Sequence, residues 1–107
     1  YSAAKAACNC ATKCAAIELR PYRIRVNAVA MGHTLTDNEN AGQSAVDPDW
    51  VQAADRDHPM GRILRPIDVV ATIGHLLSPA AVMITGTIMD LCPEYIGGAL
   101  PIGNRTT

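Results

Sequence analysis

The chain has 107 residues, 49% hydrophobic and 18% charged, a composition typical of a globular protein rather than a disordered one. Nine Lys and Arg stand against ten Asp and Glu, giving a formal net charge of -1 with no basic run, which argues against a nucleic-acid or anionic-membrane surface. Apolar stretches break well before about 18 residues, so we expect no membrane span and a cytoplasmic protein. At this length we also expect too little buried surface for independent stability.

The first predicted element is a helix over residues 1–20, which is rich in Ala and ends before Pro21. It carries three of the four cysteines: Cys8, Cys10 and Cys14. Cys8 points roughly 200° away from Cys10 on a helix, and no His stands nearby to complete four ligands. We therefore interpret them as small thiols buried in a packed helix, predict no metal site, and favour a reducing compartment.

A β-prone run over residues 23–31 stops at Gly32 and predicts a strand that is buried on at least one face. Residues 33–57 are mostly polar, which predicts a mobile loop or lid. Within this segment, residues 49–57 are compatible with a short helix that carries Trp50. We expect that Trp to pack the lid helix rather than bind a ligand.

A second helix is predicted over residues 66–77, with Pro at its start. A last strand over residues 84–91 and an irregular tail over 92–107 complete the chain. Helix, strand, loop, helix and strand in this order indicate half of an open parallel sheet, because a lone parallel pair would leave edges and one face bare. We predict an α/β fold that is incomplete without an N-terminal half. No capping residue precedes the first helix, so we also expect the chain to continue upstream.

Tyr1 and Lys5 are four residues apart, so a helix that includes both places them on one face. A free phenol, with a pKa of about 10, is a poor proton donor or acceptor at neutral pH. A nearby ammonium favours the phenolate and lowers the phenol pKa toward the working range. By itself, the pair is also compatible with an ordinary solvated contact on a helix.

The surrounding residues resemble the short-chain dehydrogenase/reductase family. Residues 1–7 (Tyr-Ser-Ala-Ala-Lys-Ala-Ala) and 24–30 (Ile-Arg-Val-Asn-Ala-Val-Ala) are similar to its active-site helix and following strand. Residues 59–62 (Pro-Met-Gly-Arg), 68–70 (Asp-Val-Val) and 84–87 (Ile-Thr-Gly-Thr) are similar to its C-terminal segment and last strand. The resemblance implies the C-terminal portion of a Rossmann-type, doubly wound parallel sheet.

The resemblance also implies an NAD- or NADP-dependent oxidoreductase that transfers hydride between the nicotinamide and a carbonyl or secondary alcohol. Tyr1 would be the catalytic acid or base, and Lys5 would lower its pKa and bind the nicotinamide ribose. The family segment Pro-Gly-x-x-x-Thr, which lines the carboxamide, corresponds to residues 31–36 (Met-Gly-His-Thr-Leu-Thr). Its implied cofactor-binding residues are Met31, Gly32, Thr34 and Thr36. The lid over 33–57 would close over the substrate.

This chain departs from the family pattern at three places. Met31 replaces the usual Pro, Thr34 replaces the common Ile or Val, and residues 92–94 (Cys-Pro-Glu) replace Asp-Gly-Gly. A Gly-rich phosphate loop is also missing, because Gly97, Gly98 and Gly103 lack its spacing and a following helix. We therefore expect the N-terminal half of the enzyme, in the same or a separate chain, as a partner, and no activity from these residues alone. The family further implies a homo-oligomer.

Two alternatives remain. The chain could be a non-catalytic scaffold or dimerisation module of the same fold, or it could use the same tyrosine for isomerisation or dehydration. Among other candidates, we interpret His33 as a surface loop histidine. The spacing of four acidic residues fits no Ca²⁺ loop and predicts solvated carboxylates. These residues are Asp47, Asp49, Asp55 and Asp57.

Overall fold

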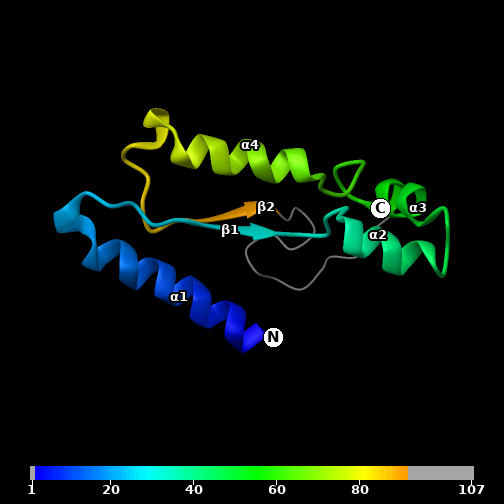
Figure 1. Ribbon diagram of the computed structural model, residues 1–107, viewed down its shortest axis with the longest axis horizontal. Coiled ribbons are helices and arrows are strands. Elements are labelled where there is room, and N and C mark those ends of the chain that lie inside the picture. Colours follow the sequence, from blue (N-terminus) through cyan, green and yellow to red (C-terminus); the bar gives the residue numbers. More distant parts are fainter. Residues whose placement is uncertain (1, 92–107) are drawn as a thin grey trace. The chain divides into compact units, whose positions relative to one another are not determined.

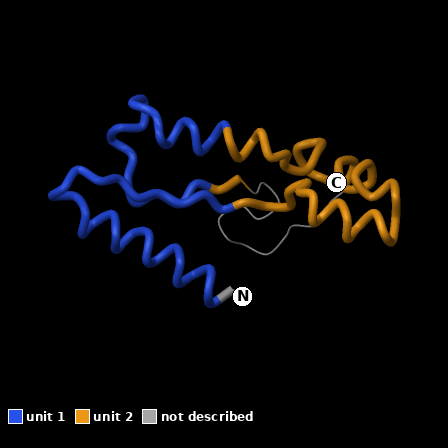
Figure 2. The backbone as a smooth tube through the Cα atoms, viewed as in Figure 1, with its two compact units in different colours: residues 1–30, 71–89 blue, residues 31–70, 90–107 orange. Residues whose placement is uncertain are grey.

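The structure is a computed structural model that describes residues 2–91, so Tyr1 and the predicted tail over 92–107 lie outside the described residues (Figure 1). The chain divides into two compact units (Figure 2). Unit 1 comprises residues 1–30 and 71–89, and unit 2 comprises residues 31–70 and 90–107.

The predicted helices and strands occur in the predicted order, and one further α-helix and two 3-10 helices are present in addition within the described residues. In chain order, the elements are α1 (Ser2–Glu18), the 3-10 helix η1 (Arg20–Tyr22), β1 (Ala28–Met31), α2 (Asp37–Ser44), α3 (Trp50–Asp57), α4 (Pro66–Leu77), the 3-10 helix η2 (Pro79–Ala81) and β2 (Ile88–Leu91). Among the described residues, no helix has both the length and the apolar character needed to cross a membrane.

Strands β1 and β2 form a two-stranded sheet. The Ala28 amide donates to the Thr87 carbonyl at 2.9 Å, and the Gly32 amide donates to the Leu91 carbonyl at 3.1 Å. The pairing advances by four residues in both strands, so the strands run parallel. Their connection contains a helix, α4, as parallel strands require. The predicted α/β fold is confirmed.

Both strands begin later than the sequence predicts, at residue 28 instead of 23 and at residue 88 instead of 84. Side chains replace ladder bonds in the residues before each strand. The side-chain Nδ2 of Asn27 donates to the Ile84 carbonyl at 3.0 Å, and Oδ1 of the same side chain accepts from the Thr87 backbone amide at 3.1 Å. The Thr85 hydroxyl accepts from the Val26 amide at 3.1 Å. Alternating β-prone residues therefore continue outside the regular strand.

Helix α1 packs closely on the turn that precedes β2, within unit 1. Ala16 is only 3% exposed, and a Cβ placed on Gly86 would lie 3.4 Å from the Ala16 Cβ. Gly86 has a φ of +71°, a left-handed conformation that favours glycine. Lys13 Nζ donates to the Gly86 carbonyl at 2.9 Å. The small side chains of α1 thus permit the close approach.

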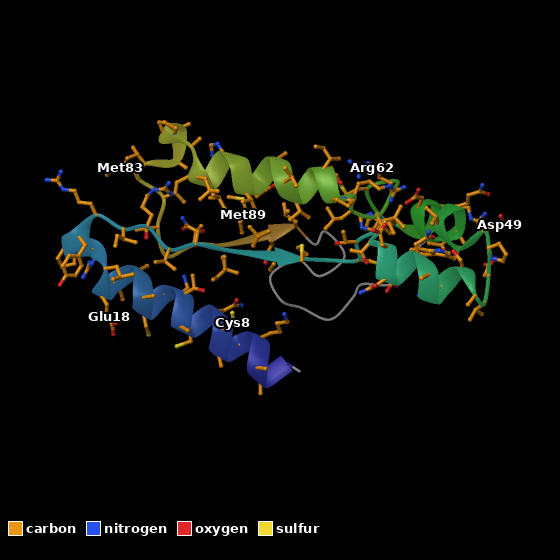
Figure 3. All side chains as sticks on the ribbon, in the orientation of Figure 1. Cys8, Glu18, Asp49, Arg62, Met83 and Met89 are labelled. Carbon is orange, nitrogen blue, oxygen red and sulfur yellow. The ribbon has the colours of Figure 1, made fainter. Side chains whose placement is uncertain are left out.

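The cysteines of α1 do not have the predicted burial. Cys8, Cys10 and Cys14 are all exposed free thiols, and Figure 3 shows Cys8 on α1. The prediction of buried thiols is wrong for this chain because α1 buries only its Ala16 side. A side-chain hydrogen bond with Cys10 raises the pKa of the Cys14 thiol. Between residues 2 and 91, no group of three His, Cys, Asp or Glu is placed to hold a metal ion.

Helix α4 has the bounds that the sequence predicts, but much of its apolar side is open. Leu76 is buried, whereas Leu77 is 77% exposed, and Val70 and Ile73 are exposed as well. Helix α4 therefore leaves apolar side chains uncovered among the described residues.

The polar segment after β1 contains a helix that the sequence analysis did not predict. Helix α2 begins after Thr36, whose hydroxyl accepts from the Glu39 amide at 3.1 Å. A Thr with Glu three residues later is the capping-box pattern, which stabilises a helix start without an apolar stripe. The prediction of a loop throughout residues 33–48 is therefore wrong at α2.

Candidate functional site

Of the predicted catalytic pair, Lys5 lies within the described residues. Lys5 lies in the first turn of the helix and is exposed. Tyr1 lies outside the described residues. Because α1 is helical from Ser2 onward, Lys5 lies in its first turn, four residues after Tyr1 in the sequence.

The predicted cofactor-binding residues lie at the end of β1 and in the segment that follows it, in unit 2. Met31 is the last residue of β1 and is exposed. After Gly32, the chain forms a parallel bridge between Thr34 and Leu64. The Leu64 amide donates to the His33 carbonyl at 3.0 Å, and the Leu35 amide donates to the Leu64 carbonyl at 2.8 Å. This pairing holds the predicted segment extended.

The bridge determines where the peptide groups of Thr34 point. In an extended segment the N–H and C=O of one residue point to the same edge, and those of the next residue point to the opposite edge. The His33 carbonyl and the Leu35 amide face Leu64, so the amide and carbonyl of Thr34 itself face the opposite edge. An N–H donor and a C=O acceptor side by side complement a carboxamide, which has a carbonyl oxygen to accept and an NH₂ group to donate.

The hydroxyl groups of the two threonines have structural partners. Thr34 Oγ1 donates to the Gly32 carbonyl at 2.9 Å, which closes the turn after β1. Thr36 Oγ1 caps α2, as described above. In this segment the side chains therefore shape the backbone, and the backbone edge at Thr34 is the group suited to recognition.

His33 is more constrained than a surface loop histidine. Its Nε2 lies 3.0 Å from Glu39 Oε1, and its ring stacks on Trp50 with centroids 5.8 Å apart and an interplanar angle of 26°. Trp50 is 6% exposed and donates from Nε1 to Asn40 Oδ1 at 3.1 Å. Hydrogen bonds from Gln43 and from His33 lower the pKa of Glu39. The predicted packing role of Trp50 in the lid agrees with this contact.

Two carboxylates to which the sequence analysis assigned no structural role fix the backbone on either side of Leu64. Asp55 Oδ1 accepts from the Ile63 amide at 2.9 Å, and Asp68 Oδ2 accepts from the Arg65 amide at 2.7 Å. Each carboxylate also pairs with an arginine: Asp55 with Arg65 at 2.6 Å, and Asp68 with Arg62 at 2.6 and 2.8 Å.

These contacts change the acidity of both carboxyl groups. The Arg65 guanidinium and the Ile63 amide lower the pKa of Asp55, and the Arg62 guanidinium holds the pKa of Asp68 well below its usual range. Figure 3 shows Arg62 just ahead of α4. The spacing of the acidic residues predicts a solvated Asp55, whereas the structure pairs it with Arg65. The available sequence signal is the number of arginines and aspartates between residues 55 and 68.

Comparison with known proteins identifies the family. Residues 1–91 match the family model described as enoyl-(acyl carrier protein) reductase. L-xylulose reductase from Bos taurus is 39% identical over 91 residues, which cover 85% of this chain and 36% of that protein.

Solved structures agree with this match. A short chain dehydrogenase family protein from Francisella tularensis has a TM-score of 0.73 at 27% identity, over 89% of this chain and 42% of that one. An NADPH-bound short chain oxidoreductase from Pseudomonas aeruginosa, described as containing an atypical catalytic center, has a TM-score of 0.73 at 26% identity, over 85% and 36% of the two chains. This chain spans 36% of the length of the bovine relative. The resemblance in sequence is thus confirmed: the chain belongs to the short-chain dehydrogenase/reductase family and has part of its Rossmann-type α/β fold.

Proposed function

We propose that this chain forms part of an NAD(P)-dependent oxidoreductase that transfers hydride between a nicotinamide and a carbonyl or secondary alcohol. The observation that carries the proposal is the Tyr1 and Lys5 pair, which lies within the residues matched by the family model. The names of two relatives support it: one is a reductase, and another is an oxidoreductase with NADPH bound.

Tyr1 is the proposed proton donor and acceptor. When bound, the nicotinamide supplies or receives the hydride at the substrate carbon. In the reducing direction, the Tyr1 hydroxyl gives its proton to the carbonyl oxygen and is left as phenolate; in the oxidising direction, the phenolate takes the proton of the alcohol. The Lys5 ammonium stabilises the phenolate and thereby lowers the phenol pKa. Lys5 also binds the nicotinamide ribose.

The segment after β1 is the proposed contact for the nicotinamide ring. Its members are Met31, Gly32, Thr34 and Thr36. The peptide edge of Thr34, turned away from Leu64, fits a carboxamide, and Gly32 presents no side chain that would obstruct the approach. Because backbone atoms make the contact, Thr at position 34 can serve in place of the Ile or Val common in the family.

The phosphate-binding part of the cofactor site is proposed to lie outside these 107 residues. Their sequence contains no Gly-rich loop between a strand and a helix. This chain spans only 36% of its bovine relative, so a longer protein, or a separate N-terminal chain, would supply that loop. These residues alone are then expected neither to hold a dinucleotide nor to transfer hydride.

Replacement of Tyr1 by Phe tests the catalytic proposal in the complete protein. Oxidation of NADH and NADPH is followed with a panel of aldehydes and ketones, together with binding of both cofactors. Tyr1→Phe should lower turnover by at least about 100-fold with cofactor binding retained, because general acid–base catalysis contributes factors of roughly 10² to 10⁴.

Tyr22→Phe is the matched control, since Tyr22 is 72% exposed on η1 and should leave turnover unchanged. Turnover that persists in Tyr1→Phe would overturn the catalytic role. No turnover in the unsubstituted protein, with assembly intact, would favour the scaffold alternative.

A further inference from the structure

His33 stands between two of the proposed cofactor contacts, Gly32 and Thr34. Its carbonyl accepts from the Leu64 amide at 3.0 Å, so its backbone is fixed on one edge. The Thr34 N–H belongs to the same planar peptide as this carbonyl and points to the opposite edge, so its direction depends on the dihedral angles that flank that peptide, ψ of His33 and φ of Thr34. Any contact that fixes His33 also limits the orientations open to the Thr34 peptide.

The ring of His33 is held first by α2. A carboxylate can only accept hydrogen bonds, so His33 Nε2 carries the proton and donates to Glu39 Oε1 at 3.0 Å. Nε2 donates in both the neutral and the protonated ring, so the bond does not require a charged histidine. Gln43 Nε2 donates to the same Glu39 oxygen at 3.1 Å, and Thr36 caps the Glu39 amide. The acceptor is therefore itself fixed.

The ring of His33 is held a second time by α3. Trp50 lies against its face, with ring centroids 5.8 Å apart and planes 26° from parallel. Trp50 is buried, and its Nε1 donates to Asn40 Oδ1 at 3.1 Å, which ties α3 to α2. Two helices of the predicted lid thus hold the side chain of His33, the residue whose carbonyl shares a peptide group with the Thr34 N–H.

We propose that His33 is a positioning residue whose ring, held by Glu39 and Trp50, fixes the Thr34 peptide edge for the nicotinamide carboxamide. This inference rests on the proposed function, because it takes residues 31–36 as the nicotinamide contact. Without the contacts to Glu39 and Trp50, residues 33–36 gain conformations that binding of the nicotinamide ring must remove, so the affinity for the dinucleotide falls. The phosphate-binding part of the cofactor site is proposed to lie outside these residues, so its contribution to affinity should stay the same.

Binding by the complete protein separates these effects. NADH and NADPH are titrated against the unsubstituted protein and His33→Ala, and so are ADP-ribose and 2′-phospho-ADP-ribose, which lack the nicotinamide ring. We expect His33→Ala to weaken binding of the preferred dinucleotide about tenfold and to leave binding of the matching ring-less ligand unchanged. Equal binding of the dinucleotide by both proteins, or an equal loss for both kinds of ligand, would overturn the inference. If the unsubstituted protein binds neither dinucleotide, the proposed function fails and this inference with it.

Variants of Glu39 give an independent test. Glu39→Gln keeps an acceptor oxygen for His33 and should stay within about twofold of the unsubstituted protein. Glu39→Ala removes one of the two contacts that hold the ring, so it should weaken binding of the dinucleotide measurably but by no more than His33→Ala does. Because His33→Ala already removes the contact that Glu39→Ala breaks, the double variant should bind no more weakly than His33→Ala alone. Additive losses would overturn the inference. His75→Ala, at an exposed position on α4, is the matched control and should bind as the unsubstituted protein does.

Discussion

Asn27→Ala should destabilise the protein markedly, although Asn27 is not among the proposed site residues. Its side chain joins the residue before β1 to the turn before β2, through the bond from Nδ2 to the Ile84 carbonyl and the bond from the Thr87 amide to Oδ1. Alanine removes both bonds. The Ile84 carbonyl keeps a bond from Arg25 at 3.2 Å, whereas the part-buried Thr87 amide loses this acceptor.

The expected magnitude follows from these two bonds. Each intramolecular hydrogen bond contributes about 1 kcal/mol net, and a buried donor left without its acceptor costs about 1–3 kcal/mol. The free energy of unfolding should therefore fall by about 2–4 kcal/mol. With a urea slope of about 2 kcal/mol per molar, the midpoint should move down by roughly 1–2 M at unchanged slope.

Urea unfolding followed by circular dichroism measures this shift. Asn38→Ala is the matched control, since Asn38 is exposed on α2 and should change stability by less than about 0.5 kcal/mol. If Asn27→Ala unfolds at the same urea concentration as Asn38→Ala, the hydrogen bonds of Asn27 do not hold the two strands together and the reasoning is refuted.

Three further changes test other contacts by the same unfolding assay. Gly86→Ala should lower the free energy of unfolding by about 1–2 kcal/mol, because the φ of +71° at this position disfavours a side chain. Gly74→Ala, within α4 and with open space around it, should raise the free energy of unfolding by about 0.5–1 kcal/mol. Equal effects of the two changes would contradict this reasoning. Trp50→Ala should cost about 3–5 kcal/mol as a buried aromatic, and Trp50→Phe clearly less; similar losses would count against the packing role. The hydrogen bond from Arg65 lowers the pKa of Asp55 in the folded state, so the stability that this pair contributes is present above the unfolded pKa of about 4 and is lost as pH falls through the folded pKa. Asp55→Asn should therefore reduce the loss of stability in acid. An unchanged dependence of stability on pH would speak against the pair with Arg65.

Much of the fold could be predicted from the sequence because local signals agree with the tertiary structure. Helix α4 begins at Pro66 and ends before Ser78, where the sequence places its start and stop. The strand starts could not be located because β-prone residues continue before β1 and β2. There, the side chains of Asn27 and Thr85 make bonds that no propensity records.

Helix α2 could have been found by its cap but not by its periodicity. Asp37–Ser44 lacks an apolar stripe, so a periodicity search returns a loop. The pattern from Thr36 to Glu39 was the available signal, and it was overlooked. Its omission also hid the acceptor that holds His33.

The candidate site likewise contains residues that the sequence predicts and contacts that it does not predict. Tyr1, Lys5 and residues 31–36 were identified by resemblance, because their spacing along the chain is itself the motif. The contact between His33 and Trp50 joins residues 17 positions apart, and the pair of Asp55 with Arg65 joins residues 10 apart. Such contacts depend on how the segments fold back on one another, which a single sequence does not record.

The pH dependence of turnover most directly tests the central claim, that Lys5 lowers the pKa of Tyr1 in a hydride-transfer site. In the complete protein, kcat for alcohol oxidation should rise with pH through an apparent pKa clearly below that of a free phenol, about 10. Lys5→Met removes the ammonium that favours the phenolate, so the surviving activity should rise only at higher pH, near the free-phenol value. An unchanged apparent pKa in Lys5→Met would contradict the account.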